Sequence, residues 1–359
     1  MTEYNFHQGF ERLANAWSGK GDRPPVFAQL HEFALRQSGE SGKKFYQNSE
    51  IFVKGILNTS KNISLDIPDI VWDAYNLEAE ALGVKVFFKD NASPALDQTP
   101  IIENEKDLAA LKIPDPEASG RYGFAMDCME IFRELTSVAS PHSFCSPMSL
   151  ATLLIGYEKI VMEAYTNPDF VHKVLTVITE EVIAPYINAV FNRFEDCPAA
   201  DGADALSSLP FLTPEMLENF SVPYILRLRE LCGDRVVVRN WWGDSFSKDL
   251  DAFWDMKMKV GNNVLEVQDP DLFKIGPDKV MAYAKKKNCP VILGVDQTLL
   301  ANGTPGEIEE RLKEYMRVGG QNRKLVLYLC NLNFSTPPEN IAAAVSAVNE
   351  YGWYDEVVK

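Results

Sequence analysis

Regularly spaced cysteines are missing from this chain of 359 residues, and histidine is rare, with four in all. Six cysteines are scattered without a CxxC pair: Cys128, Cys145, Cys197, Cys232, Cys289 and Cys330. The pattern excludes a disulfide framework and a His/Cys-rich metal motif. We therefore expect reduced thiols in a reducing compartment.

Positive charge and long apolar runs are also scarce. Lys and Arg number 35 against 51 Asp and Glu, giving a net charge of −16. Such a surface does not suit nucleic acid or an anionic membrane, because it offers little to neutralise phosphate. No stretch reaches the roughly 18 apolar residues of a membrane helix, and the N-terminus lacks the basic and apolar regions of a signal peptide. These absences predict a cytoplasmic protein with neither a nucleic-acid nor a membrane partner.

Several familiar catalytic motifs are absent as well. The sequence contains no GxSxG, no GxxxxGK[ST], no HExxH and no convincing GxGxxG after a strand. The motifs therefore give no support to a serine hydrolase, a P-loop nucleotide-binding protein, a zinc protease or a dinucleotide-binding enzyme.

A regular alternation of short β-branched runs and amphipathic segments is present. Strands are expected at 26–31, 67–73, 137–140, 199–208, 236–238, 264–267, 291–296 and 325–330. Helices separate most of them, including a long one over 168–193, and residues 84–115 are expected to leave the main sheet. Because no linker divides the chain, we predict one domain over 1–359. Its expected fold is a (β/α)₈ TIM barrel with an N-terminal helical extension over 1–24.

The run Val236–Asp244 carries the most distinctive strand end. Three valines predict a buried strand, which ends in Asn240, Trp241, Trp242 and Gly243. In a parallel barrel such an end delivers side chains to the ligand-binding face. The two Trp side chains either line a substrate site or close the hydrophobic core.

The other strand ends are rich in carboxylates and amides and poor in Lys and Arg. Such a mouth does not suit a phosphate or polycarboxylate substrate, which calls for Arg or Lys. The candidate site residues there, besides Asn240 and the Trp pair, are Phe27, His31, Asp73, Tyr75, Asn76, Glu78, Asp296, Cys330, Asn331 and Asn333. Asp296 is either a loop cap or a catalytic acid, and His31 is either structural or part of the site. Cys330 is either a small buried hydrophobe or a thiolate that attacks or binds zinc.

An ordered series of short motifs resembles the uroporphyrinogen decarboxylase superfamily, and especially its cobalamin-dependent methyltransferase branch. The motifs are Gly21–Phe27, Asp73–Gly83, Ser146–Ala151 before Gly156, Leu212–Pro214 before Pro223–Tyr224, Gly294–Asp296, Gly303–Ile308 and Thr336–Asn340. They extend over nearly the whole chain. The resemblance implies a (β/α)₈ barrel and agrees with the barrel expected from the strand pattern.

The resemblance also shows where this chain departs from its relatives. The decarboxylases bind an acidic tetrapyrrole with an Arg after the first strand, where this chain has Leu30, His31 and Glu32. Their Tyr after the third strand falls at about Leu153, and their late His at about Cys330. The thiol-directed methyltransferases hold zinc with a His-x-Cys and a later Cys. Cys330 matches the later Cys, but Asn240-Trp241-Trp242 replaces the His-x-Cys.

We therefore expect a corrinoid-dependent methyltransferase that moves a methyl group from a small substrate to a cobalt(I) corrinoid. Aromatic walls from Phe27, Tyr75 and the Trp pair would suit an aryl methyl ether, as in an O-demethylase, or a methylated ammonium or sulfonium. Asp73, Glu78 and Asp296 are the expected proton donors or counter-charges, with Cys330 as a further catalytic candidate. The corrinoid is expected on a separate partner protein, because the Asp-x-His-x-x-Gly motif of corrinoid-carrying domains is absent.

Three alternatives remain open at this stage. The first is the reverse transfer, from a methyl-corrinoid to a thiol, with Cys330 as a zinc ligand completed by His31, Asp73 or Glu78. The second is a decarboxylase-like lyase. The third is a binding protein without catalytic activity on the same barrel.

Overall fold

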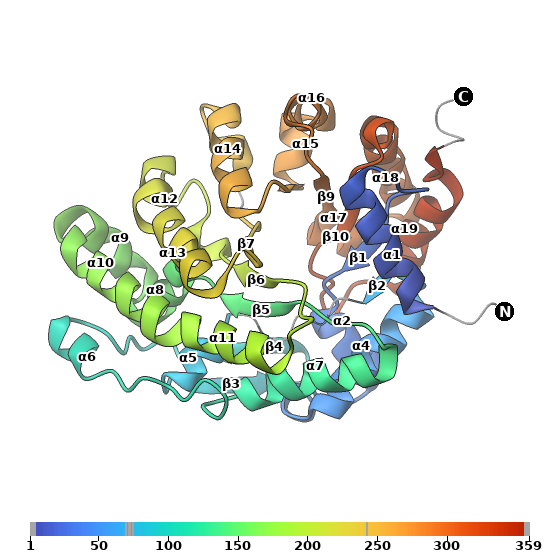
Figure 1. Cartoon of the computed structure of the whole chain (residues 1–359). Helices are drawn as coiled ribbons and strands as arrows, with labels where there is room; N and C mark the ends of the chain where they lie inside the picture. The colour runs from blue at the N-terminus through green and yellow to red at the C-terminus, as the bar shows by residue number, and fades with distance from the viewer. Residues whose placement is uncertain (1–4, 69, 71–72, 74, 242, 355–359) are drawn as a thin grey trace.

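The computed structural model of the chain describes residues 5–68, 70, 73, 75–241 and 243–354. Its core is built from parallel strands in two hydrogen-bonded sheets (Figure 1). The larger sheet has the order β2–β1–β10–β9–β8, with strands Ile67–Pro68, Val26–Ala28, Leu325–Leu329, Val291–Val295 and Leu265–Gln268. The smaller has the order β5–β6–β7, with strands His142–Cys145, Ala200–Ala203 and Val236–Val238. Seven of these eight strands overlap the regions expected from the sequence, and β5 does not, in an α/β fold.

The two sheets do not join into one closed ladder. Among the described residues, no strand pairing links β7 to β8 or β2 to β5. The α/β class with parallel strands is thus confirmed. The predicted barrel would have one continuous sheet, whereas the described residues form two separate parallel sheets. Figure 1 shows the helices around the outside of the strands, as βαβ crossovers require.

Helices follow or precede each strand with the short caps expected from the sequence. The side chain of Thr304, for example, accepts a hydrogen bond from the Glu307 backbone N–H, and the Glu307 carboxylate accepts one from the Thr304 backbone N–H. The helices are α1 Phe6–Ser18, α2 His31–Ser38, α3 Gly42–Phe45, α4 Ser49–Asn62, α5 Leu77–Ala81, α6 Glu105–Ala109, α7 Tyr122–Thr136, α8 Pro147–Ile155, α9 Tyr157–Thr166, α10 Pro168–Val177, α11 Ala184–Arg193, α12 Pro214–Phe220, α13 Val222–Cys232, α14 Leu250–Val260, α15 Asp271–Ile275, α16 Pro277–Lys287, α17 Gln297–Asn302, α18 Pro305–Gly319 and α19 Pro338–Tyr351.

The third strand of the expected alternation was placed wrongly. Ser137 ends α7 in a left-handed conformation, with φ of 55°. The strand follows at β5, over His142–Cys145, which the sequence pattern assigned to a loop. All four residues of β5 are buried, because both faces of a parallel strand are covered. The strand nevertheless contains both polar and apolar side chains, whereas a buried strand was expected to show an apolar run.

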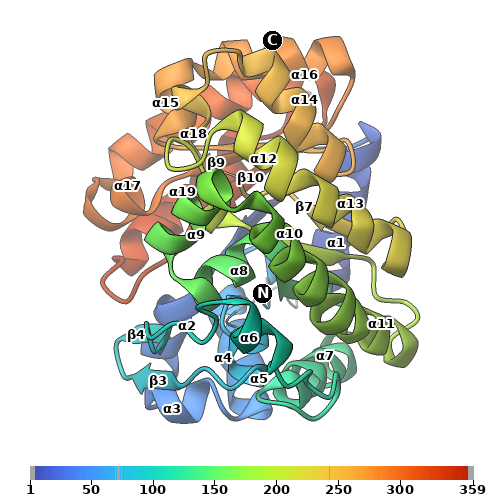
Figure 2. The same cartoon turned by 90° about the vertical axis from the view of Figure 1, so that its left-hand side faces the viewer.

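The predicted excursion from the main sheet is an antiparallel hairpin. Its strands β3, Val86–Lys89, and β4, Ala92–Leu96, pair only with each other. The hairpin packs against α2 and α3, at the end of the molecule away from α14 and α16 (Figure 2). Its position beside α2 brings β4 close to the end of β1.

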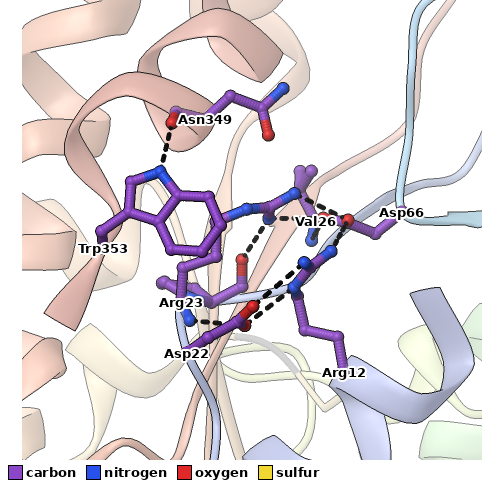
Figure 3. A network of polar contacts seen from close by, with 8 residues as sticks. Arg12, Asp22, Arg23, Val26, Asp66, Asn349 and Trp353 are labelled. Atoms are coloured by element: carbon purple, nitrogen blue, oxygen red, sulfur yellow. Dashed lines mark hydrogen bonds and ion pairs between the residues drawn. The ribbon is translucent and has the colours of Figure 1, made fainter. Parts of the chain in front are cut away.

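The first helix is fastened to the strands by a buried charge network (Figure 3). Asp66, just before β2, accepts hydrogen bonds from Arg12 at 2.6 Å and from Arg23 at 2.7 and 2.8 Å. It also accepts one from the backbone N–H of Val26 in β1, at 2.9 Å. Asp22 holds the other side of the Arg12 guanidinium, at 2.9 and 3.1 Å. Helix α1, within the segment expected to be an extension, is therefore bound to the ends of two strands.

The long helical segment over 168–193 is confirmed. It consists of α10, a π-helical turn over Ile178–Ile183, and α11. Pro185 lacks a backbone N–H to donate to the preceding turn, which accounts for the wider turn at this point. By length and composition this segment passes the test for a membrane span, but 61% of its most apolar window is buried in the fold, as for a core helix.

Candidate active site

A cavity of about 1520 Å³ runs along the inside of the strands. One end is lined by residues after the strands, such as His31, Tyr75 and Asn331, and the other by residues before them, such as Pro141 and Asp234. The interior of a TIM barrel is usually filled by side chains. Here the side chain of Asp201, within β6, remains 37% accessible, which shows that the interior is hollow.

Eight of the predicted site residues line this cavity. They are Phe27, His31, Asp73, Tyr75, Asn76, Asn240, Asn331 and Asn333. Each lies in or just after a parallel strand, and carboxyl ends of neighbouring parallel strands meet on one face. The structure thus brings together residues that are up to 306 positions apart in sequence, from Phe27 to Asn333.

A hydrogen-bonded bridge crosses the cavity mouth between the ends of β2 and β7. The Asn240 side-chain amide donates to the Tyr75 hydroxyl at 3.1 Å. The backbone N–H of Ala205 also donates to Tyr75, at 3.1 Å, and that of Asp204 donates to the Asn240 oxygen at 2.7 Å. Tyr75 and Asn240 are therefore held rigidly, as a binding site requires.

Asp73 is the carboxylate that the mouth positions most firmly. It pairs with Arg121 of the α7 N-terminus at 2.5 Å and accepts a hydrogen bond from Asn76 at 2.5 Å. Burial raises the pKa of Asp73 to about 6, against the opposing effect of Arg121. Near neutral pH this carboxyl can therefore carry either a proton or a negative charge.

The β3–β4 hairpin closes one side of the mouth, which the sequence did not reveal. Ser93 of β4 donates to Glu32 at 2.8 Å and lies 3.3 Å from the Nδ1 of His31. The Nε2 of His31 is buried without a hydrogen-bond partner among the described residues. His31 also adopts φ of 30°, a conformation that costs about 1–3 kcal/mol for a residue with a β-carbon. Burial lowers the pKa of His31, which favours the neutral imidazole.

Glu78 does not line the cavity. Its side chain is fully buried behind β5 and accepts a hydrogen bond from the backbone N–H of Cys145 at 2.9 Å. Burial raises the pKa of Glu78 to about 8, so the carboxyl is protonated at neutral pH. Its second oxygen has no hydrogen-bond partner within the described part of the chain. The predicted catalytic acid is thus placed in the core.

Trp241 is also placed in the core rather than in a substrate wall. Its side chain is 1% exposed, and its indole N–H donates to Asp204 at 2.6 Å. Asp204 accepts further hydrogen bonds, each of 2.8 Å, from Ser149, Ser207 and Ser221. Of the two alternatives for this Trp, core packing fits the contacts. Trp242 lies outside the described residues.

Two further predicted residues lie away from the cavity surface. Asp296 caps α17 by accepting from the backbone N–H of Leu299 at 2.7 Å, which is the loop-cap alternative. Cys330 is 6% exposed, and its thiol donates to the Gln268 oxygen at 2.9 Å. Burial raises the pKa of Cys330, so the thiol form is favoured over a nucleophilic or zinc-binding thiolate.

The residues around Cys330 do not fit a zinc ion. Within the described ranges, no group of three or more His, Cys, Asp or Glu side chains is arranged to hold a metal. Zinc sites in proteins need three or four such ligands. A protonated, hydrogen-bonded thiol beside an amide supplies none of them in the required form.

Arg239 adds a positive charge to a cavity whose strand ends were expected to be poor in Lys and Arg. It lines the cavity and pairs with Asp201, and Glu266 lies within reach of both charges. Burial raises the pKa of Glu266, which is 8% exposed. Side chains alternate between the two faces of a strand, so Arg239 faces the same side as Val237, which also lines the cavity. This alternation along β7 was the signal that could have identified Arg239 from the sequence.

An aromatic pair forms one wall of the cavity interior. Phe27 of β1 stacks on Tyr328 of β10, with ring centroids 4.5 Å apart and an angle of 11° between the rings. The Tyr328 hydroxyl donates to the Gln29 side chain at 2.9 Å. Phe27 was predicted from its place on the first strand, whereas Tyr328 was overlooked within an apolar run.

The fold has a close structural counterpart. A methyltransferase from Methanosarcina mazei superposes with a TM-score of 0.79 and covers 97% of this chain and 99% of its own length. The two sequences are 19% identical, so the likeness concerns the fold.

Sequence relatives carry a different name. A protein named uroporphyrinogen decarboxylase from Xylella fastidiosa is 29% identical over 230 residues, which span 58% of this chain and 61% of the relative. One of the same name from Anaeromyxobacter dehalogenans is 26% identical over 292 residues, covering 76% of this chain and 77% of the relative.

The family model for uroporphyrinogen decarboxylase (URO-D) matches residues 9–351. The match extends from α1 through α19 and includes every strand that lines the cavity. The resemblance noted in the sequence is thereby confirmed, and the chain belongs to the uroporphyrinogen decarboxylase family.

Proposed function

We propose that the protein transfers a methyl group from a small methylated donor to a cobalt(I) corrinoid carried by a separate protein. The donor classes that suit the cavity are an aryl methyl ether and a methylated ammonium or sulfonium. The structural likeness to a protein named a methyltransferase supports this choice within the family.

The observation that carries the proposal is the chemistry at the end of β1. An acidic tetrapyrrole requires cationic groups there, whereas this chain presents the neutral His31 and the carboxylate of Glu32 to the cavity. Five carboxylates line the cavity, from Glu32, Asp73, Asp201, Asp234 and Glu266, against two guanidiniums, from Arg235 and Arg239. A porphyrinogen with several carboxylates would meet repulsion along most of this wall.

The residues of the mouth supply binding and orientation. When docked, the corrinoid supplies the cobalt nucleophile. Tyr75 and Asn240 fix the edge of the mouth, and Phe27 with Tyr328 provides an apolar wall that excludes water from the donor. Asp73 lies where it can protonate a departing oxygen or balance the charge of a cationic donor.

The test incubates the purified protein with a reduced corrinoid protein and, separately, an aryl methyl ether, a quaternary ammonium, a sulfonium or uroporphyrinogen. We expect the cobalt(I) absorption to be replaced by that of methyl-cobalt with at least one methyl donor and uroporphyrinogen to remain intact. Decarboxylation of uroporphyrinogen without any methyl transfer would contradict this proposal and would support the decarboxylase activity for which the relatives are named.

A further inference from the structure

Arg239 carries hydrogen-bond donors that the protein leaves unused. Its Nη1 pairs with Asp201, while its Nε is buried and has no hydrogen-bond partner among the described residues. A buried guanidinium N–H without an acceptor is costly and rare in folded proteins. Arg239 nevertheless lines the cavity, and 17% of its side chain is exposed, so the guanidinium can take a carboxylate of a bound ligand beside Asp201.

Beside Arg239, negative charge is in excess. Asp201 and Glu266 both line the cavity, and the charges of Asp201 and Arg239 both act on Glu266. The nearby Lys257 is already engaged, with its ammonium on Asp244 at 3.0 Å and on the backbone oxygen of Trp241 at 2.8 Å. Arg239 pairs directly with Asp201 alone, while the carboxylate of Glu266 accepts a hydrogen bond from Gln268 and is influenced by Arg239 only through space.

No singly charged ligand matches both features. An anion would satisfy the free donors of Arg239 but would face Asp201 and Glu266 at close range. A cation would balance the carboxylates but would be repelled by the guanidinium of Arg239, which lines the same cavity. A molecule with a carboxylate and a cationic group a few ångströms apart satisfies both at once.

We propose that the cavity binds a small zwitterion, with its carboxylate on Arg239 and its methylated ammonium or sulfonium group against Asp201 and Glu266. This substrate class rests on the proposed methyl transfer and selects among its donors. Ile292, which is the strand partner of Glu266, and Val237, the partner of Asp201, add apolar wall for the methyl groups.

A cationic donor also simplifies the chemistry. The cobalt electron pair forms the new bond to the methyl carbon as the nitrogen–carbon bond breaks. The bonding pair stays on nitrogen, which leaves as a neutral amine, so no proton has to be supplied. Asp201 and Glu266 then orient the donor rather than act as acids.

The test measures ligand binding by calorimetry on the full chain without any corrinoid protein. Three probes separate the charges: glycine betaine, its isostere 3,3-dimethylbutanoate, in which a neutral carbon replaces the ammonium nitrogen, and tetramethylammonium. We expect glycine betaine to bind at least about tenfold more tightly than either of the others. Equal affinity for the cation or the anion would overturn the proposal, as would failure of both glycine betaine and the longer γ-butyrobetaine to bind.

Substitutions test which side chain binds the carboxylate of the ligand and which binds its cationic group. Arg239→Gln should remove the advantage of glycine betaine over tetramethylammonium, and Glu266→Gln should reduce its advantage over 3,3-dimethylbutanoate. The double variant Arg239→Gln/Asp201→Asn removes a pair together and guards against misfolding. Arg311→Gln is the matched control, because Arg311 pairs with Asp269 outside the cavity at a similar exposure, 18% against 17% for Arg239. Loss of betaine binding in this control but not in Arg239→Gln would also overturn the assignment.

Failure of the two proposals would look different. Selective binding of the zwitterion without methyl transfer to cobalt would remove the proposed function and leave the ligand class standing. Methyl transfer from a neutral ether, with no preference for a zwitterion in binding, would support the proposed function and overturn the proposed ligand class.

Discussion

Asp73 and Glu78 are five residues apart and both have a raised pKa, yet only Asp73 faces the cavity. Asp73 is held by Arg121 and Asn76 at the mouth, whereas Glu78 is enclosed behind β5. Both carboxyls were predicted to be proton donors or counter-charges. Their surroundings separate a site residue from a core residue, because only a group in contact with the ligand can act on it.

Asp73→Asn should lower the rate of methyl transfer from an ether donor by about a hundredfold, since an amide cannot donate a proton to the departing oxygen. The rate is measured from the appearance of methyl-cobalt. Glu80→Gln is the matched control, because Glu80 binds the same Arg121 at 2.5 Å but does not line the cavity. Equal losses in the two variants would mean that Asp73 matters only for holding Arg121.

Glu78 should make the stability depend on pH. Its pKa is raised from 4.5 to about 8, so its contribution is fully present below about pH 4.5 and is lost as the pH rises through 8. Over that window the free energy of unfolding should fall by up to about 1.4 kcal/mol per pH unit from this group. Glu78→Gln should flatten this part of the curve, measured by denaturant unfolding from pH 5 to 9. Parallel curves for the two proteins would contradict the assignment.

Trp241 is expected to act on stability and not on the reaction. Trp241→Phe removes the indole hydrogen bond to the buried Asp204 and should lower the free energy of unfolding by about 1–3 kcal/mol. The methyl-transfer rate of the folded fraction should stay unchanged. A loss of methyl-transfer activity with an unchanged free energy of unfolding would instead support the alternative that Trp241 lines the substrate site.

At the scale of elements, α1, β1 and β2 depend on one carboxylate. Asp66 ties Arg12 and Arg23 to the backbone of Val26, and all three ionised side chains are less than 10% exposed (Figure 3). Asp66→Asn leaves two buried guanidiniums without their shared counter-charge. The free energy of unfolding should fall by about 3 kcal/mol.

The control for this variant is Asp251→Asn. Asp251 pairs with Lys286 at 2.9 Å, but both side chains are more than half exposed, so this change should cost less than about 1 kcal/mol. Chemical denaturation of the two variants decides the matter. Similar losses from both would show that the network at α1 is no stronger than a surface pair.

Elements with strong local patterns could be predicted, and elements defined by their neighbours could not. The valines of β7 and the long segment over 168–193 were identified because apolar periodicity survives whatever the surroundings. The β5 strand was misplaced because His142 and Ser143 have no strand pattern and are buried only by adjoining elements. The segment that forms the β3–β4 hairpin was expected to leave the sheet. Its contact with Glu32 and His31 could not be predicted, because it depends on how the hairpin packs in the tertiary fold and not on the local sequence.

For the molecule as a whole, the order of strands was predictable and the filling of the barrel was not. Strand ends identify the residues at the mouth, so Tyr75, Asn76 and Asn240 could be named in advance. Whether an interior position is packed or hollow depends on all the strands together. Asp201 and Glu266 lie at strand ends that the sequence identified, but Arg239 and the grouping of all three in one cavity emerged only from the structure.

The central claim is that this cavity holds a methyl donor for a corrinoid partner. The most direct measurement is a single turnover with a donor carrying a ¹³C-labelled methyl group, stoichiometric corrinoid protein in the cobalt(I) state, and detection of the label by NMR and mass spectrometry. The account predicts one labelled methyl group on cobalt for each donor consumed, at a rate that Asp73→Asn lowers about a hundredfold when the donor is an ether. A label that stays on the donor, with every donor class supplied and the corrinoid protein active with another methyltransferase, would contradict it.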